Sequence, residues 1–200
     1  MKFLCINLPQ AADRRAHCDE QFKIAGIDVK YLRAFHGRES RLKHESDWIS
    51  NQIGACISHY MAVEFARIND EITVIFEDDI KLTECFKTKL GVLLSQLHAT
   101  DSNWDVCALA YFGANGNNGD VPKFKDVGNL QKVTFGDVYG QAAYIVNGAR
   151  GAENILNYIT PIRSHIDKMF WECCRDGYLN GYFVKDQFVT QGWDFPSQNV

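Results

Sequence analysis

Residues 72–79 read Ile-Thr-Val-Ile-Phe-Glu-Asp-Asp, a short apolar run that ends in three adjacent carboxylates. A continuous run of β-branched and aromatic residues favours a strand that is buried on both faces of a sheet. Ligands of open α/β sheets bind at the carboxyl ends of the strands, and this is where Glu77, Asp78 and Asp79 would lie. Because adjacent carboxylates repel one another, a divalent cation with oxygen ligands is a natural partner for them. The same carboxylates would equally suit a solvated turn that opens a helix, where negative charge is favourable.

Strands and helices alternate along the rest of the chain. Strands are expected over residues 3–8, 29–35, 72–76, 104–111 and 182–184, with two more short strands within 130–146. Helices are expected over residues 13–25, 52–69, 86–97, 149–158 and 165–175, loops over 36–50 and 113–120, and a polar tail after 184. This alternation predicts an α/β sandwich with a mainly parallel central sheet. No repeat or long linker divides the chain, so we expect a single domain over residues 1–200.

The composition excludes several classes of partner. With 21 basic and 25 acidic residues, the net charge of -4 offers no general attraction to nucleic acid or to an anionic membrane. The apolar start, residues 1–6, is shorter than a signal peptide requires, and no run approaches the ~18 apolar residues of a membrane span. The seven cysteines form no CxxC pair and are odd in number, which favours buried free thiols in a reducing compartment. We therefore expect a cytoplasmic protein, at most peripheral at the membrane, with no transmembrane segment and no nucleic-acid partner.

Short motifs are spread over nearly the whole chain. They are Ile6-Asn7-Leu8 followed by Asp13-Arg14-Arg15, Ala34-Phe35-His36-Gly37, Gly54-Ala55-Cys56-Ile57-Ser58-His59, Glu77-Asp78-Asp79, Gly140-Gln141-Ala142-Ala143-Tyr144 and Ile166-Asp167-Lys168-Met169. In this ordered set the chain resembles glycosyltransferase family 25, the lipooligosaccharide and procollagen galactosyltransferases. It departs from the family at Ala55, where a cysteine usually follows the helix glycine, and it lacks the proline pair that often precedes a segment like Val189-Thr190-Gln191.

The resemblance implies a nucleotide-sugar-binding sandwich of the GT-A type and a metal-dependent transfer of galactose or glucose. The donor would be a UDP-sugar and the acceptor a glycan, a glycolipid or a lipooligosaccharide-type molecule, with inversion at the anomeric carbon. By this resemblance Asp79 contacts Mn²⁺ or Mg²⁺ directly, Asp78 contacts the sugar, the ribose or the metal, and Glu77 mainly shapes the turn. Asp167 matches the family's later aspartate and is the candidate general base. It would also suit a helix N-terminus without any catalytic role.

Five further residues are candidates for donor binding, each with a structural alternative. Arg14 could grip the diphosphate or be a surface charge in the first helical turn. Asn7 could reach the nucleotide base or fix the turn after its strand. Ser58 and His59 share a helix side with small residues, so His59 could touch the donor or orient an acidic residue. Gln191 lies in the expected polar tail, which could close over the nucleotide or fray as an ordinary terminus.

Two other functional classes stay open on sequence grounds. The first is a metal-dependent phosphohydrolase with an acidic strand end, although the chain has no GxxxxGK[ST] phosphate loop. The second is a non-catalytic module that binds a nucleotide sugar without turnover, since the acceptor half departs most from the family.

Overall fold

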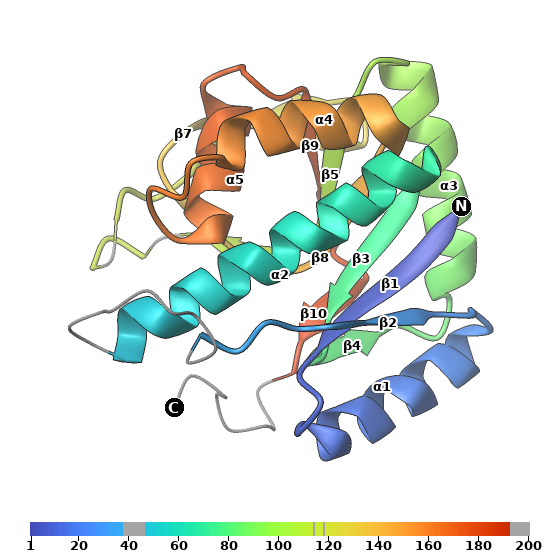
Figure 1. The fold of residues 1–200 in the computed structure, drawn as a ribbon. Coiled ribbons are helices and arrows are strands. Elements are labelled where there is room, and N and C mark those ends of the chain that lie inside the picture. The colour runs from blue at the N-terminus through green and yellow to red at the C-terminus, as the bar shows by residue number, and fades with distance from the viewer. Residues whose placement is uncertain (38–46, 114, 118, 193–200) are drawn as a thin grey trace.

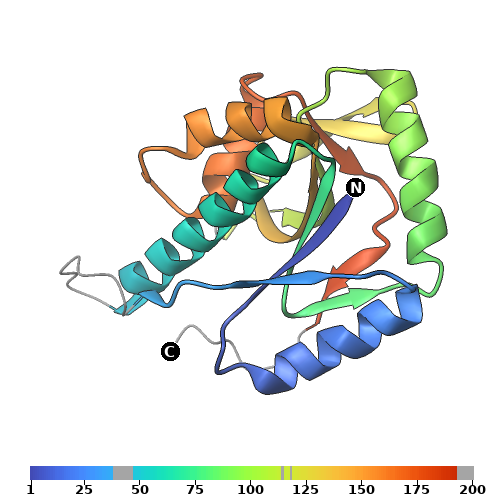
Figure 2. The same cartoon turned by 45° about the vertical axis from the view of Figure 1, so that its right-hand side comes forward.

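The structure is a computed structural model that describes residues 1–37, 47–113, 115–117 and 119–192. Its strands are β1 (Lys2–Asn7), β2 (Lys30–Arg33), β3 (Thr73–Glu77), β4 (Ile80–Leu82), β5 (Val106–Gly113), β6 (Lys123–Val127), β7 (Leu130–Phe135), β8 (Val138–Val146), β9 (Gly181–Val184) and β10 (Val189–Gln191). Its helices are α1 (Ala12–Ala25), α2 (Asp47–Asn69), α3 (Phe86–Thr100), α4 (Gly148–Ile159) and α5 (Ile166–Arg175). The helices cover a central sheet on both faces, with α2, α4 and α5 on one side and α1 and α3 on the other (Figures 1 and 2).

The central sheet has the order β2-β1-β3-β8-β5-β9-β7-β6 in the described part of the chain. β1 pairs in parallel with β2 and β3, and β5 pairs in parallel with β9. β8 lies antiparallel between β3 and β5, and β7 lies antiparallel between β9 and β6. It follows that β2, β1, β3, β5, β9 and β6 run in one direction, whereas β8 and β7 run against it. This confirms the predicted α/β class with a mainly parallel sheet.

Strand β3 lies inside the sheet, between β1 and β8, and is buried on both faces as predicted. Val74 and Phe76 of β3 pack against the side of α1 and α3, and Ile75 packs against the side of α2, α4 and α5. All three side chains are fully buried. A strand covered on both faces has no polar face, which is why its sequence is a continuous apolar run. The acidic triplet begins where β3 leaves this core.

Four elements differ from the sequence-based expectation. β6 was not predicted because it is a lysine-bearing strand at the edge of the sheet, where charged side chains are common. β4 and β10 form a separate antiparallel ribbon, so part of the expected polar tail is a strand. Strands of three residues are too short to give a period-2 pattern. Helix α2 begins at Asp47, five residues before the predicted start, and thus replaces the end of the expected loop 36–50. The rest of that loop lies largely outside the described residues.

The buried face of α2 is formed mostly by small side chains, together with His59 and Val63. Apolar periodicity predicted a helix here, but Tyr60, Met61 and Ile68 are exposed on it, whereas Ala62 and Ala66 are fully buried. Small residues let the helix backbone approach its neighbours closely, so they occupy the packed side. None of the described helices, α2 included, has both the length and the apolar character needed to cross a membrane. The seven cysteines are free thiols and most are buried, as predicted.

Candidate active site

The acidic triplet lies at the carboxyl end of β3, beside a cavity of about 420 Å³. Glu77 ends β3, and Asp78 and Asp79 form the turn that leads into β4. Six of the predicted site residues contribute to the wall of this cavity: Arg14, Ser58, His59, Asp78, Asp79 and Gln191. They come from α1, α2, the turn after β3, and β10, so the fold gathers residues that are far apart in sequence. The strand-end placement predicted for the carboxylates is confirmed.

Both carboxylate oxygens of Asp78 are occupied by fixed partners. The Asn7 amide donates to Oδ2 at 2.8 Å, and Nη1 of Arg14 donates to Oδ1 at 2.8 Å. Arg14 is only 7 % exposed, so it is a buried counter-ion and not the surface charge that was one alternative. A buried charge is stable only when it is paired and hydrogen-bonded. Asn7 and Arg14 thus hold Asp78 in place, with Asn7 at the end of β1 and Arg14 in the first turn of α1.

Asp79 is less completely compensated than its neighbour. Its Oδ2 accepts a hydrogen bond from the Gln191 amide at 3.0 Å and lies 3.7 Å from Nη1 of Arg14. Its Oδ1 is buried and has no hydrogen-bond partner among the described residues. Burial, and after it the charge of Glu77, raise the pKa of Asp79 from 3.8 to about 7. An unpaired carboxylate oxygen of this kind fits a cation, because a hard divalent ion prefers oxygen ligands.

His59 fixes the position of Glu77. Its Nε2 lies 3.1 Å from Oε1 of Glu77, and its Nδ1 lies 3.0 Å from the hydroxyl of Tyr144 on β8. A carboxylate can only accept, so Nε2 of His59 donates to Glu77, while the other ring nitrogen contacts the Tyr144 hydroxyl. Of the two roles predicted for His59, the contacts with Glu77 match the orienting of an acidic residue. Glu77 was expected mainly to shape the turn, and it also lines the cavity.

Ser58 and Gly54 position the wall of the cavity opposite the carboxylates. The Ser58 hydroxyl donates to the Gly54 carbonyl at 2.7 Å and accepts the Phe35 N–H at 2.8 Å. A Cβ on Gly54 would stand 2.7 Å from the Phe35 carbonyl oxygen and 2.8 Å from the Gly37 nitrogen. Only glycine allows so close an approach of two backbones. The motif that contains Gly54 and Ser58 therefore holds the segment after β2 against α2.

Asp167 lies in a second cavity, of about 250 Å³, which adjoins the first. Its Oδ2 accepts the Gly140 N–H at 3.0 Å and its Oδ1 accepts the Lys168 N–H at 2.8 Å. Glu77 and Gln191 line both cavities, so the candidate base lies across from the acidic triplet within one continuous region. The contact with Gly140 fixes the carboxylate beyond what a helix N-terminus alone requires.

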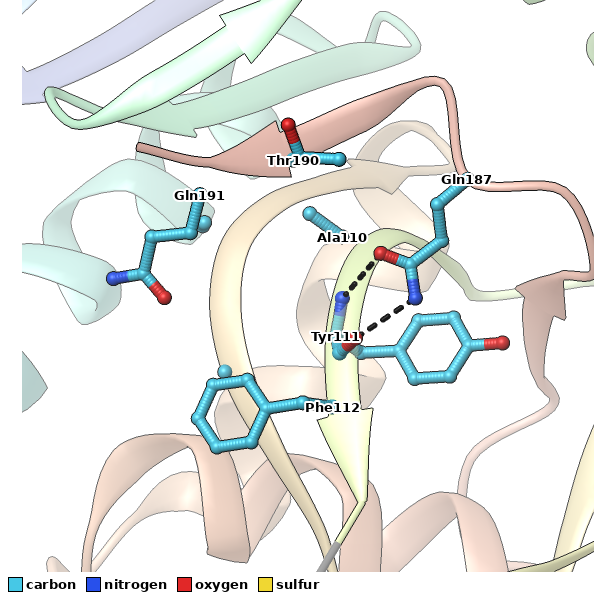
Figure 3. Close-up of a pocket in the computed structure, with 8 residues that line it drawn as sticks. Ala110, Tyr111, Phe112, Gln187, Thr190 and Gln191 are labelled. Carbon is cyan, nitrogen blue, oxygen red and sulfur yellow. Dashed lines mark hydrogen bonds between the residues drawn. The ribbon is translucent and has the colours of Figure 1, made fainter. Parts of the chain in front are cut away.

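Phe112 and Gln191 form the junction of this region with a third cavity, of about 180 Å³. Figure 3 shows this third cavity, in which the Gln187 side chain turns toward the backbone of Tyr111. The Gln187 amide donates to the Tyr111 carbonyl at 2.8 Å and accepts the Tyr111 N–H at 3.4 Å. No sequence pattern pointed to Phe112. Gln191 reaches Asp79 because β10 pairs with β4, and this pairing places Gln191 opposite Ile80, the residue after Asp79.

Comparisons with protein-family models and with known proteins agree on one family. The family model described as glycosyltransferase family 25 (LPS biosynthesis protein) matches residues 1–170. A "Glycosyltransferase 25 family member" of Aedes aegypti is 26% identical over 200 residues, which cover 88% of this chain and 32% of that protein. A "Procollagen galactosyltransferase 1-A" of Xenopus laevis is 27% identical over 170 residues, which cover 76% of this chain and 27% of that protein. The chain thus spans about a third or less of the length of these relatives.

Two solved structures resemble the fold. A glycosyltransferase involved in the glycosylation of the major capsid of PBCV-1 gives a TM-score of 0.51 at 11% identity, covering 98% of this chain and 93% of that chain. A UDP-glucose pyrophosphorylase complexed with UDP-glucose gives a TM-score of 0.50 at 9% identity, covering 96% of this chain and 89% of that chain. At such low identity the likeness concerns the fold alone, and it agrees with the predicted GT-A-like class.

Proposed function

The chain belongs to glycosyltransferase family 25, and from this membership we propose that it moves galactose or glucose from a UDP-sugar to a glycan or lipooligosaccharide-type acceptor. The observation that carries the proposal is Asp79, which lines a cavity of about 420 Å³ and whose buried Oδ1 has no hydrogen-bond partner among the residues that the structure describes. Negative charge develops on the leaving diphosphate, and an active site must supply compensation there.

We propose that the nucleotide and diphosphate occupy this larger cavity. Arg14 and Gln191 line it beside the two aspartates, so a guanidinium and an amide can donate to phosphate oxygens. Asn7 does not line the cavity and acts by holding Asp78. Ser58 acts in the same indirect way through the Phe35 segment of the wall.

A divalent cation, Mn²⁺ or Mg²⁺, would be held by Asp79 with Asp78 as its neighbour. Among the described residues, no group of three or more His, Cys, Asp or Glu side chains is arranged to hold a metal. This suits an ion that takes one or two carboxylates from the protein and its other ligands from substrate phosphates. When bound, such an ion would neutralise charge on the leaving diphosphate.

Asp167 is proposed as the general base of an inverting displacement. The acceptor hydroxyl oxygen would bond to the anomeric carbon as the bond to the diphosphate oxygen breaks, and its proton would pass to the Asp167 carboxylate. Both oxygens of that carboxylate accept backbone N–H groups, so its position is set before an acceptor arrives. We further propose a cytoplasmic location, which rests on the cysteine content.

Metal-dependent stabilisation by UDP tests the proposal. At a UDP concentration 100 times its Kd, binding adds about 2.7 kcal/mol to the stability of the folded state, which corresponds to a rise in Tm of roughly 5–10 °C for a chain of this size. We expect this rise in wild type only with Mn²⁺, its loss in Asp79→Ala, and its retention in Asp28→Ala, an exposed aspartate that does not line the cavity.

Each alternative function predicts a different result. No metal-dependent shift with UDP would contradict both the transferase and the nucleotide-sugar module. A shift without UDP release from UDP-galactose or UDP-glucose, in the presence of a panel of glycan acceptors, would favour the module. Release of inorganic phosphate from UDP would favour the phosphohydrolase.

A further inference from the structure

Gln141 is a buried glutamine whose amide has no protein partner among the described residues. It lies on β8 between Gly140 and Ala142, and it is 3% exposed. Neither its Oε1 nor its Nε2 has a hydrogen-bond partner in that part of the chain. Buried polar side chains are nearly always paired, so each exception calls for an explanation. The proposed function so far gives this side chain no role.

The backbone around Gln141 is irregular where this residue lines the second cavity. Gly140 adopts a left-handed φ of 78°, and the β5–β8 register shifts between Ala110 and Phe112. The Gly140 N–H bonds to Asp167, and its carbonyl accepts the Trp171 indole N–H at 2.9 Å, so α5 holds this irregular backbone in place. Irregularities of this kind in a strand redirect a side chain, and they are frequent next to active sites.

The cavity that Gln141 lines is small, and polar side chains form part of its wall. Its volume is about 250 Å³, and its wall carries polar side chains from four different elements. These are Asn51, Gln52, Glu77, His165, Asp167 and Gln191. At roughly 30 Å³ for each water molecule, the space corresponds to about eight waters, which suits one sugar ring better than a nucleotide. Amide, imidazole and carboxylate groups together offer both donors and acceptors, as a ring bearing several hydroxyls requires.

We propose that Gln141 forms hydrogen bonds with two neighbouring hydroxyls of a hexose bound in this cavity. A carboxamide presents an acceptor and a donor side by side, so Oε1 can accept from one hydroxyl while Nε2 donates to the next. Because Glu77 and Gln191 belong to both cavities, a hexose joined to a diphosphate beside Asp79 would extend to Gln141. Asp167 lines the same cavity, so the hexose of an acceptor would also come within its reach. The inference rests on the proposed function and assigns the sugar-recognition residue within it.

Binding measurements on Gln141→Leu test the inference. We expect the ratio of the Kd for UDP-galactose or UDP-glucose to the Kd for UDP, measured with Mn²⁺, to rise at least tenfold, which is about 1.4 kcal/mol. The Tm of the ligand-free variant should stay equal or rise, because the change removes an unpaired buried amide. Gln141→Met, which is unbranched and similar in length, repeats the test if the leucine variant folds poorly.

Gln187→Leu is the matched control, because this glutamine lines the neighbouring third cavity but has both its amide atoms bonded to Tyr111. The control should lower Tm and leave the Kd ratio within twofold of wild type.

A second experiment separates the two sources of the hexose, donor and acceptor. Methyl β-galactoside and methyl β-glucoside are titrated into each protein in the presence of UDP and Mn²⁺.

The outcomes are distinct. A changed Kd ratio for the UDP-hexose supports recognition of the donor sugar, and weaker binding of a methyl glycoside alone supports recognition of the acceptor sugar. If UDP binds to all variants and neither measurement differs from wild type, Gln141 does not recognise a sugar, while the proposed function stands. If UDP does not bind to wild type with Mn²⁺, the proposed function fails and the inference fails with it.

Discussion

Replacing Asp79 by asparagine should stabilise the metal-free protein. The Asp79 carboxyl is buried and lies next to Glu77 and Asp78, and these surroundings raise its pKa from 3.8 to about 7. The asparagine side chain would be nearly the same size, would keep an acceptor for the Gln191 amide, and would carry no charge. The substitution therefore removes the electrostatic cost of the site while its shape is kept.

The size of the effect follows from the pKa shift. Between pH 3.8 and 7 the folded state holds a proton that the unfolded state has lost, so the free energy of unfolding of wild type falls as pH rises through this window. At about 1.4 kcal/mol for each pH unit between the two pKa values, the rise from 3.8 to about 7 gives a gain for Asp79→Asn of about 4 kcal/mol at pH 8. The gain should shrink to about 2 kcal/mol at about pH 5.5 and vanish below pH 3.8.

Urea unfolding in EDTA, followed by tryptophan fluorescence at several pH values from about 4 to 8, measures this gain. Asp78→Asn is the control with the opposite sign, because both oxygens of Asp78 are bonded and its pair with Arg14 is buried. Breaking such a pair costs about 3–5 kcal/mol. The reasoning would be refuted if Asp79→Asn were no more stable than wild type at pH 8, or if its gain did not depend on pH.

Three further predictions concern the residues around the carboxylates. Asp167→Asn should lower kcat by roughly 10²–10⁴-fold with an unchanged Kd for UDP-galactose; a kcat within threefold of wild type would exclude a base. Gly54→Ala should destabilise the protein by roughly 1–3 kcal/mol and weaken UDP binding, because its Cβ would press on the Phe35 carbonyl; urea unfolding and UDP titration check both effects. His59→Ala should cost roughly 1–3 kcal/mol in the same unfolding assay, since it leaves the buried Tyr144 hydroxyl without this partner, and an unchanged stability would contradict the contact.

The parts of the fold that could be predicted from the sequence are those with a long apolar run or with apolar residues on one side of a helix. β3 is an unbroken apolar run, and its placement puts the acidic triplet at a strand end. Gly26 predicted the end of α1. It has a φ of 66° and donates its N–H to the Lys23 and Phe22 carbonyls, as a glycine at a helix C-terminus does. Long amphipathic or apolar segments carry enough residues to show their period, and here they also carry most of the site.

The parts that were missed depend on pairing between distant segments. Val189 of β10 is buried and Thr190 is exposed, but a strand of three residues is too short to show this alternation as a pattern. Its pairing with β4 brings Gln191 to Asp79 over 112 positions. Gln141 stands inside a recognised motif, yet its missing partners are visible only once its neighbours in the described chain are placed. A sequence identifies which residues are polar, and only the packing shows which of them are left without a partner.

This distinction explains how three adjacent carboxylates come to have different roles. Glu77 is held by His59 from α2, and Asp78 by Arg14 from α1 and Asn7 from β1. These helices pack on opposite faces of the sheet, so each reaches a different member of the triplet. What remains is one buried oxygen, Oδ1 of Asp79, without a partner in the described residues. A cation site at this position would therefore depend on Arg14 and His59 as much as on its own ligands, because they satisfy the neighbouring carboxylates and leave the uncompensated charge at Asp79.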